Sequence, residues 1–324
     1  MNKYKETFGV DISKAVFDVQ GSKCGPHQFS NSPNGFRSFL KLLPDDSLVV
    51  MEATGYYHYR LSQFLCKNEI AVSVVNPLSV KRFIEMKLSR VKTDKSDAQS
   101  ICDYGIYNKV PLYNQISAVQ SECRQLLSLK SSYLKRRTST KNKLHGERVL
   151  DVPSKLVVRS LLLDKKHIDR ELVKIEKRLL LLVKQSSQRE LTLLKSIPGI
   201  GDKTAVFLIV ATDSFRKFSN ASQLCSYLGT TPMIKRSGSS VRGRSRISKM
   251  GNRNLRNLMF MCSMSAYKHN RSCKAIHDRI VSKGKSSKLA LMAVCNKLIH
   301  QAFAIVRSGV EYNPDYVSVR KRLI

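Results

Sequence analysis

The first hundred residues alternate short apolar runs with amphipathic stretches, a pattern typical of strands and helices in turn. Residues 6–20 (ETFGVDISKAVFDVQ) alternate apolar and polar positions around a tight Asp-Ile-Ser-Lys turn, which predicts a β-hairpin. Residues 47–54 (SLVVMEAT) and 70–77 (IAVSVVNP) predict buried strands, the second ended by Asn-Pro. Helical spacing follows in three stretches: 30–43, with Ser and Pro start signals, 55–68, and 93–106, with an acidic first turn. We therefore expect an α/β domain over residues 1–112.

The pattern changes between about residues 117 and 195, which form long, Leu-rich helical stretches with a basic polar face. Asp151-Val152-Pro153 separates the two halves. We expect an antiparallel helical hairpin or coiled coil over residues 113–192, acting as an arm, a dimer seam or both.

Glycines open the third part of the chain, in residues 196–213 (SIPGIGDKTAVFLIVATD). Gly199 and Gly201, with Lys203 after them, are expected between a short helix and a longer apolar one. This resembles a helix-hairpin-helix element, whose backbone N–H groups meet a DNA phosphate; a plain turn between core helices has nearly equal weight. We expect a mainly helical domain over residues 193–310 and a basic tail over 311–324.

Charge separates these parts further. The chain carries 57 Lys and Arg against 24 Asp and Glu, a net charge of +33 that is typical of proteins that bind a polyanion. Residues 1–112 hold 15 basic and 11 acidic side chains, a net +4, which leaves +29 for the rest. This division predicts chemistry in the first part and nucleic-acid binding in the second.

Cysteine usage and hydropathy indicate the compartment. The eight cysteines are scattered without a CxxC pair, which argues against a zinc site and favours a reducing compartment. The N-terminus lacks an apolar signal core, and no apolar run looks long enough to span a bilayer. We expect a cytoplasmic protein with no membrane partner.

Four acids in the first part form a candidate metal site. Asp11 and Glu52 end predicted strands, while Asp94 and Asp97 lie three apart at a predicted helix start, beside Lys92. Each alone could be a turn, surface or capping residue. Together they predict a site of oxygen ligands for Mg²⁺ or Mn²⁺, whose ions would clamp both oxygens of a phosphoryl displacement.

Residues 235–256 (KRSGSSVRGRSRISKMGNRNLR) hold eight basic residues, five serines and no acid. They could form a solvated loop, a grip on nucleic acid, or a grip with a nucleophile inside it. Basic side chains would neutralise phosphates, and the alternating arginines would face one side of an extended segment. The candidate contacts are Arg236, Arg242, Arg244, Arg246, Lys249, Arg253 and Arg256.

The acidic stretches GVDISKAVFDV, VMEATGYYH and RVKTDKSDAQSI resemble the three acidic motifs of the DEDD insertion-sequence transposases. YLGTTP and GNRNLR resemble the C-terminal transposase domain of that family. The likeness covers nearly the whole chain in the same order, although the middle helices match only in character. It implies an RNase H-like, RuvC-type mixed sheet at the N-terminus, with Asp11, Glu52, Asp94 and Asp97 holding the metal.

The resemblance also implies a serine nucleophile that forms a phosphoserine link with DNA. Ser237 matches the family's Ser-Gly pair best, while Ser239 and Ser240 stay open as alternatives. No His or Asp nearby in the sequence offers a base, so activation would come from the metal site or a cation. Family members are guided by a structured RNA that pairs with donor and target double-stranded DNA, and they work as dimers joined into tetramers.

The leading hypothesis is therefore a transposase of a bacterial or archaeal insertion sequence, associated with the nucleoid. A RuvC-like, metal-dependent Holliday-junction nuclease that forms no covalent intermediate is the second hypothesis. A non-catalytic nucleic-acid-binding protein with a decayed acid set is the third. A covalent protein–DNA adduct distinguishes the first from the other two.

Overall fold

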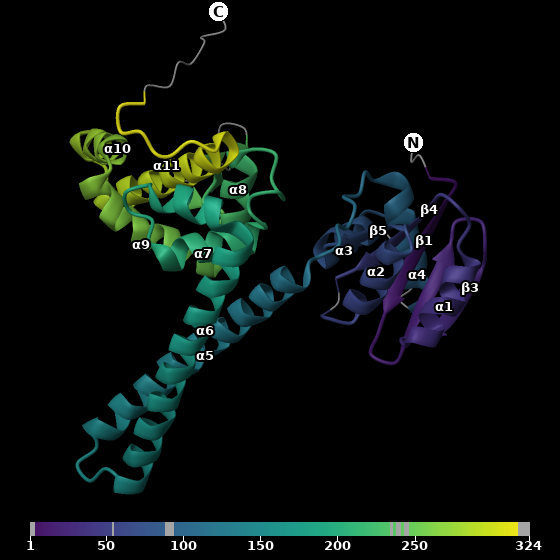
Figure 1. Cartoon of the computed structure of the whole chain (residues 1–324), viewed down its shortest axis with the longest axis horizontal. Helices are drawn as coiled ribbons and strands as arrows, with labels where there is room; N and C mark the ends of the chain where they lie inside the picture. Colours follow the sequence, from purple (N-terminus) through teal and green to yellow (C-terminus); the bar gives the residue numbers. More distant parts are fainter. Residues whose placement is uncertain are drawn as a thin grey trace, which may run out of the picture. The chain divides into compact units, whose positions relative to one another are not determined.

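The computed structural model describes residues 4–53, 55–87, 94–233, 236–237, 241–242 and 246–316. For Asp94, Lys95, Arg236, Ser237, Val241 and Arg242 it describes the backbone alone. The chain divides into two compact units, residues 1–117 and 118–324 (Figure 1).

Unit 1 is built on a mixed five-stranded sheet. Its strands are β1 (Glu6–Ile12), β2 (Val16–Gly21), β3 (Pro26–Ser30), β4 (Ser47–Glu52) and β5 (Ala71–Val75). They lie in the order β3-β2-β1-β4-β5. β1, β2 and β3 pair antiparallel, whereas β1, β4 and β5 run parallel. The predicted hairpin and both predicted buried strands are confirmed.

Helices cover both faces of this sheet (Figure 1). They are α1 (Pro33–Leu42), α2 (His58–Lys67), α3 (Pro77–Met86) and α4 (Asp94–Tyr107). α1 and α2 share a core with Phe8, Val10 and Met51, while Leu48 and Val50 face the core of α3 and α4. These alternating positions bury both faces of β1 and β4, as the apolar run of β4 predicts.

Two elements of unit 1 have no counterpart in the sequence prediction. β3 is an edge strand whose residues are mostly exposed, so it lacks the apolar alternation that marks the other strands. α3 begins directly after the Asn-Pro that ends β5. Asn76 caps this helix by accepting from the Leu78 N–H at 2.9 Å, with Pro77 in the first turn. The same dipeptide therefore stops a strand and starts a helix.

Unit 2 begins with a long helical hairpin of α5 (Ala118–Val149) and α6 (Lys155–Lys195), here called the arm. Ile168, Leu172, Ile175 and Leu179 are buried at three- and four-residue spacing along α6. The backbone leaves helical geometry at Ser187, where α6 kinks. The two long helices of the prediction are present.

The remaining helices of unit 2 share one core with the last part of α6 (Figure 1). They are α7 (Asp202–Thr212), α8 (Ala221–Leu228), α9 (Arg253–His269), α10 (Arg271–Ser282) and α11 (Ser287–Ser308). α11 is long and apolar enough to cross a membrane by length and composition, contrary to the sequence expectation. Val294, Leu298 and Ala302 on this helix are nevertheless fully buried in the core of unit 2.

The segment before the glycine turn differs from the prediction. The expected short helix is the last part of the 41-residue α6, which continues to Lys195. The turn 196–201 then leads into α7, in which Ala205, Leu208, Ile209 and Val210 are buried. The two helices joined by this turn therefore both belong to the core of unit 2.

Candidate active site and nucleic-acid interface

Two of the predicted acids lie on one face of the sheet in unit 1. Asp11 is near the end of β1, and Glu52 is the last residue of β4. The parallel register pairs Val10 with Met51, so Asp11 and Glu52 are the next positions along these neighbouring strands. Val10 and Met51 point into the core with α1 and α2, so the two acids point to the opposite face. That face is the one covered by α4.

The first turn of α4 is directed toward the same edge by close packing. A Cβ atom on Gly9 would lie 2.2 Å from both the Ala98 carbonyl oxygen and the Cys102 backbone nitrogen. The Cys102 thiol donates to the Thr7 carbonyl at 3.1 Å. α4 thus runs opposite to β1, and its first turn extends toward the end of β1 that carries Asp11.

Asp97 lies in that first turn and is half-buried, and Asp94 is the first residue of the helix. Among the described side chains, no three His, Cys, Asp or Glu residues are gathered closely enough to hold a metal ion. The side chain of Asp94 lies outside the described part of the structure. Lys92, predicted beside these acids, lies outside the described residues.

Asp18 is a further carboxylate at this edge that the sequence prediction did not include. It pairs directly opposite Asp11 across β1 and β2, so both side chains lie on the α4 face. Gln28 donates to Asp18 Oδ1 at 3.0 Å from the edge strand β3. The sequence held the information needed to place Asp18, because the alternation of side chains around the turn at residues 12–15 fixes which positions of the hairpin oppose one another.

His58 begins α2, shortly after Glu52 in the chain. Burial lowers the pKa of its imidazole, so the ring is neutral at pH 7. Its Nδ1 atom is buried without a hydrogen-bond partner in the described part of the chain.

The serine-rich loop of unit 2 is a ladder of very short strands. β6 (Pro232–Met233) pairs with β9 (Arg246–Ile247), and β7 (Arg236–Ser237) pairs with β8 (Val241–Arg242). Ser237 lies opposite Val241 in this register, and Arg236 lies opposite Arg242. The predicted alternatives Ser239 and Ser240, together with Arg244, lie outside the described residues.

The remaining predicted cations of this region divide into two kinds. Arg246, Lys249 and Arg253 are exposed and available to a ligand. Arg256 is only 9% exposed, and its Nη1 donates to the carbonyls of Leu228 at 2.7 Å and Lys249 at 3.2 Å. We therefore remove Arg256 from the predicted nucleic-acid contacts, because its guanidinium is buried against the backbone.

The two glycines of the turn at residues 196–201 differ in how closely they are packed. Gly199 has φ +107°, and a Cβ there would lie 2.7 Å from the Ala266 Cβ of α9, which explains this glycine by packing. Gly201 precedes α7 in open space. Lys203 is exposed, but its Nζ pairs with Glu176 at 2.9 Å. Asp202 places a carboxylate in the first turn, where it competes with a phosphate for the helix N-terminus.

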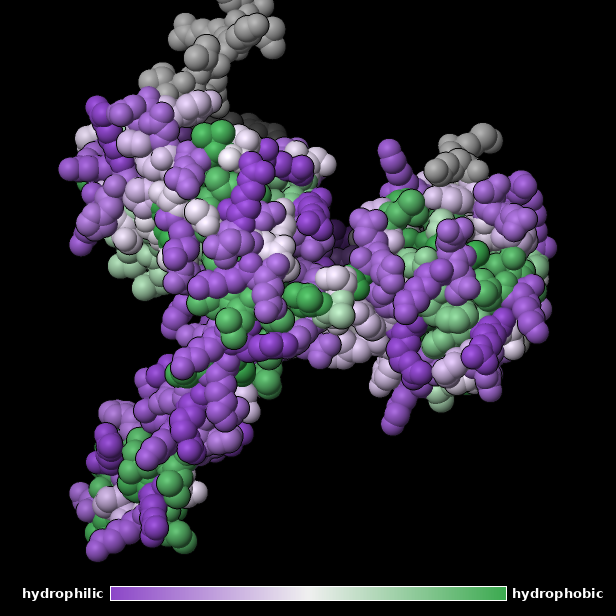
Figure 2. All heavy atoms as spheres, viewed as in Figure 1, coloured by the Kyte–Doolittle hydropathy of each residue, from purple (hydrophilic) through white to green (hydrophobic). Residues whose placement is uncertain are grey.

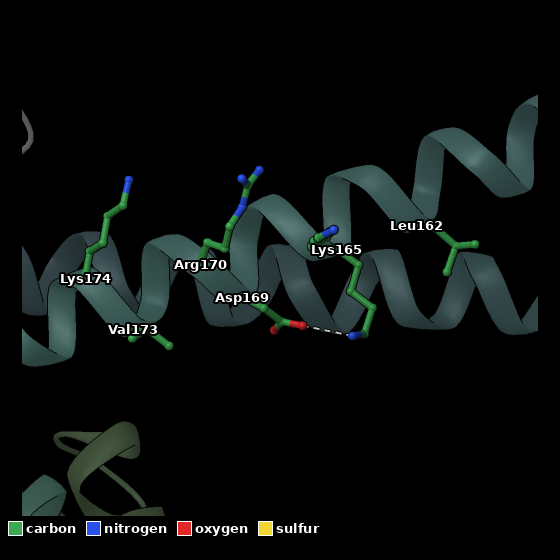
Figure 3. Close-up of a pocket in the computed structure, with 7 residues that line it drawn as sticks. Leu162, Lys165, Asp169, Arg170, Val173 and Lys174 are labelled. Atoms are coloured by element: carbon green, nitrogen blue, oxygen red, sulfur yellow. Dashed lines mark hydrogen bonds and ion pairs between the residues drawn. The ribbon is translucent and has the colours of Figure 1, made fainter.

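A basic groove runs along the arm on α6 (Figure 3). Its lining comes from a single helix and combines cations with apolar side chains: Leu162, Lys165, Lys166, Asp169, Arg170, Val173 and Lys174. Lys165 pairs with Asp169 and Lys174 pairs with Glu171, each at 2.8 Å, so two of its cations are already neutralised. The groove widens the basic surface of unit 2 beyond the loop.

Family models match both ends of the chain. A model described as Transposase, of the DEDD and IS110 type, matches residues 8–151, which include all four predicted acids. A second, described as Transposase IS116/IS110/IS902 family, matches residues 191–278, which include the serine-rich loop. The two matches follow one another in the order of the units.

Full-length relatives agree with these models. The chain is 28% identical to a pilin gene-inverting protein of Moraxella bovis over 318 residues, covering 94% of this chain and 97% of the relative. It is 23% identical to the transposase for insertion sequence element IS1111A of Coxiella burnetii, covering 89% and 86% respectively. The chain therefore belongs to the IS116/IS110/IS902 family of transposases, and it is a DNA transposase.

Proposed function

We propose that this transposase cuts and rejoins DNA through a phosphoserine intermediate, with metal-bound acids of unit 1 assisting. The observation that carries the proposal is the convergence of Asp11, Glu52 and the first turn of α4 at one edge of the mixed sheet. A mixed sheet covered by helices on both faces also supports a RuvC-like, RNase H-type fold for this unit.

Asp11, Glu52, Asp94 and Asp97 would hold the metal. All four offer carboxylate oxygens, the ligands that Mg²⁺ and Mn²⁺ prefer. Asp11 and Glu52 lie on the face of the sheet that α4 covers, near the first turn of this helix. The donor chemistry therefore fits a hard divalent ion. A bound ion would neutralise charge on the phosphate and stabilise its displacement. The acids' own task is to orient that ion at the edge of the sheet.

Ser237 is the proposed nucleophile, with Ser239 and Ser240 as alternatives. Its Oγ would form a bond to phosphorus while the bond between phosphorus and the deoxyribose oxygen breaks. The serine loses its proton, and the departing sugar oxygen gains one. Attack by a sugar hydroxyl of the second strand then reverses these bonds and restores the serine, so the energy of the phosphodiester is conserved.

Basic side chains would bind the nucleic acids. The proposed set is Lys92, Lys203, Arg236, Arg242, Arg244, Arg246, Lys249 and Arg253, together with backbone N–H groups of the turn that holds Gly199 and Gly201. We propose donor and target double-stranded DNA as partners, together with a structured guide RNA that reads both sequences. The protein would act in the cytoplasm, associated with the nucleoid.

The arm would join copies of the chain into a dimer and then a tetramer. Near its end, Val152, Leu156 and Leu163 are 89%, 77% and 59% exposed. Figure 2 shows apolar side chains gathered at this end of the arm. Apolar surface on a two-helix hairpin is typical of a coiled-coil interface.

The names of relatives favour strand joining over hydrolysis. The Moraxella bovis relative is named as a protein that inverts a gene, and inversion of DNA needs every cut strand to be rejoined. A RuvC-like nuclease would stop after cleavage. For this reason we place the covalent mechanism ahead of the metal-dependent nuclease.

The test is a denaturing gel that detects protein–DNA adducts on a supercoiled plasmid carrying the gene and its flanking non-coding DNA, with RNA transcribed from that flank. We expect an adduct with the wild type and none with Ser237→Ala, which keeps DNA binding. Ser239→Ala and Ser240→Ala are matched controls that retain the adduct. Asp11→Asn abolishes cleavage and the rise in melting temperature caused by Mg²⁺.

Three outcomes contradict parts of this proposal. Cleavage without an adduct supports the nuclease. An adduct lost only in Ser239→Ala or Ser240→Ala moves the nucleophile. Full activity in Asp11→Asn removes the acid site from the reaction.

A further inference from the structure

The loop that carries Ser237 leaves unit 2 through a narrow base, which we call the neck: residues 227–233 on one side and 246–252 on the other. Three backbone hydrogen bonds cross it. Lys249 N–H donates to Gly229 at 3.1 Å, Ser248 N–H to Thr231 at 2.9 Å, and Asn252 N–H to Tyr227 at 2.8 Å. The pairing of β6 with β9 continues this ladder outward. The neck thus holds together the two chain segments between which β7 and β8 lie in the sequence.

Arg256 forms hydrogen bonds with both sides of the neck. It lies on α9, and a single guanidinium nitrogen, Nη1, donates to Leu228 on one side and Lys249 on the other. The carbonyls are 21 residues apart in the chain, and the loop with Ser237 lies between them. A side chain of the rigid helix therefore fixes both ends of the loop.

The backbone makes room for this guanidinium. Gly229 has φ +71°, and a Cβ there would lie 2.8 Å from Arg256 Nη1 and 2.4 Å from the Met250 carbonyl oxygen. Gly251 has φ +127°, and a Cβ there would lie 2.2 Å from the Tyr227 carbonyl oxygen. A positive φ and a close approach coincide at both glycines, so the neck is shaped around a specific packing.

Arginine is an unfavourable residue for a buried position with a purely structural role, because its charge must be removed from water. Among the residues that the structure describes, Arg256 pairs with no carboxylate, so its buried charge is compensated by carbonyl dipoles. A buried cation without a full counter-charge costs solvation energy that an apolar residue would not. What Arg256 provides in return is the directed, two-point attachment of the neck to α9.

We propose that Arg256 is a positioning residue for the serine reaction: it holds the neck closed and thereby aligns Ser237 with the phosphate. This inference rests on the proposed function, because it needs a nucleophile in the loop. Misplacing a reacting group by about 1 Å can cost about 100-fold in rate. Loss of Arg256 should therefore slow adduct formation far more than it weakens DNA binding.

The test compares wild type, Arg256→Ala and the matched control Arg271→Ala, a surface arginine at the start of α10 whose side chain is 81% exposed. The probe is the same plasmid and flanking RNA. We measure the single-turnover rate of adduct formation, DNA affinity, and hydrogen exchange of the neck amides. Arg256→Ala is expected to lose about 100-fold in rate, with affinity within about twofold and faster exchange in the neck. Arg271→Ala is expected to match the wild type.

Chemical rescue distinguishes positioning from general destabilisation. Millimolar guanidinium, well below denaturing concentrations, should enter the space left by Arg256→Ala and restore at least part of the rate, without helping Ser237→Ala. Gly229→Ala is a second variant, which keeps the arginine in the sequence but is expected to open the same neck, because its Cβ would crowd Arg256 Nη1 and the Met250 carbonyl. An unchanged adduct rate in Arg256→Ala overturns the inference, as does equal loss of affinity and rate. Absence of an adduct in the wild type overturns the proposed function instead.

Discussion

The acidic edge of unit 1 and the serine loop of unit 2 are held by opposite means. Asp11 and Glu52 extend from regular, fully paired strands, and α4 is packed against β1 so closely that Gly9 admits no side chain. The loop with Ser237 is instead joined to unit 2 at the neck, where the hydrogen bonds involve backbone groups of Leu228, Gly229 and Lys249. One site is fixed by packing, and the other by a few polar contacts.

The difference suggests a division of labour between the two sites. Carboxylates that bind an ion need a constant geometry, which close-packed backbone supplies. A nucleophile that must attack, hold and release a strand is typically carried by a loop that a rigid scaffold positions. A larger side chain packed beneath the acidic edge should therefore abolish its activity, whereas removal of a single hydrogen bond in the neck should impair the reaction of the serine.

The largest expected effect tests the packing. Gly9→Ala places a Cβ 2.2 Å from two backbone atoms of α4, so the helix must move away from β1. We expect a loss of about 3 kcal/mol in the free energy of unfolding of unit 1, together with loss of cleavage. Thermal denaturation of the full chain and hydrogen exchange of the β1 amides measure the first, and the plasmid assay measures the second.

Gly25→Ala is the matched control, because a Cβ at Gly25 meets nothing within 4 Å. It is expected to unfold like the wild type and to retain cleavage. Wild-type stability in Gly9→Ala would contradict the close packing of α4 against β1 as the support of the acidic edge.

A smaller effect tests the neck. Asn252 caps α9 by accepting from the Leu255 N–H at 3.0 Å, and its side chain also donates to the Tyr227 hydroxyl at 3.3 Å. Asn252→Ala should cost about 1 kcal/mol in stability and reduce the rate of adduct formation. Denaturant unfolding and single-turnover gels measure the two effects.

Asn220 provides the control, since it caps α8 in the same way by accepting from the Gln223 N–H at 2.9 Å. Asn220→Ala should cost a similar free energy of unfolding without slowing adduct formation. Equal rates in both variants would show that the cap stabilises unit 2 but does not position the serine.

The sequence predicted the regular parts of this molecule well for a physical reason. The strand around Asp11 and the strand ending at Glu52 are marked by apolar positions, because burial dictates their composition. The first turn of α4 is marked by acids, which the dipole of a helix N-terminus favours. Asp18 was missed although the hairpin register determines its face. β3 carried little apolar signal because it is an exposed edge strand.

The neck could not be predicted in the same way. Arg256 looked like one more cation in a basic segment, and only the fold shows it buried beneath Leu228 and Lys249. Gly199 looked like part of a phosphate-binding turn, but its φ and its contact with Ala266 explain it by packing. In both cases a tertiary contact decided a role that local composition left open.

The smallest effect concerns a carboxylate of unit 2 that serves structure alone. Glu176 on α6 pairs with Lys130 at 3.0 Å and with Lys203 at 2.9 Å. Burial raises the pKa of Glu176, but hydrogen bonds from Lys203 and Lys130 outweigh it and hold the pKa below the ordinary 4.5. A lowered pKa stabilises the fold above pH 4.5, and this contribution is lost as pH falls through the folded-state pKa.

Glu176→Gln should therefore cost about 1 kcal/mol in the free energy of unfolding at pH 7, and the difference from wild type should shrink as the pH falls below 4.5. Denaturant unfolding between pH 3 and 7 measures it. Asp315→Asn, which removes a pair exposed at 81% and 77%, should have no measurable effect. The melting temperature of Glu176→Gln should still rise when Mg²⁺ is added, unlike that of Asp11→Asn. Loss of that rise would mean that the arm communicates with the acidic edge, and the two sites could no longer be treated as separately supported.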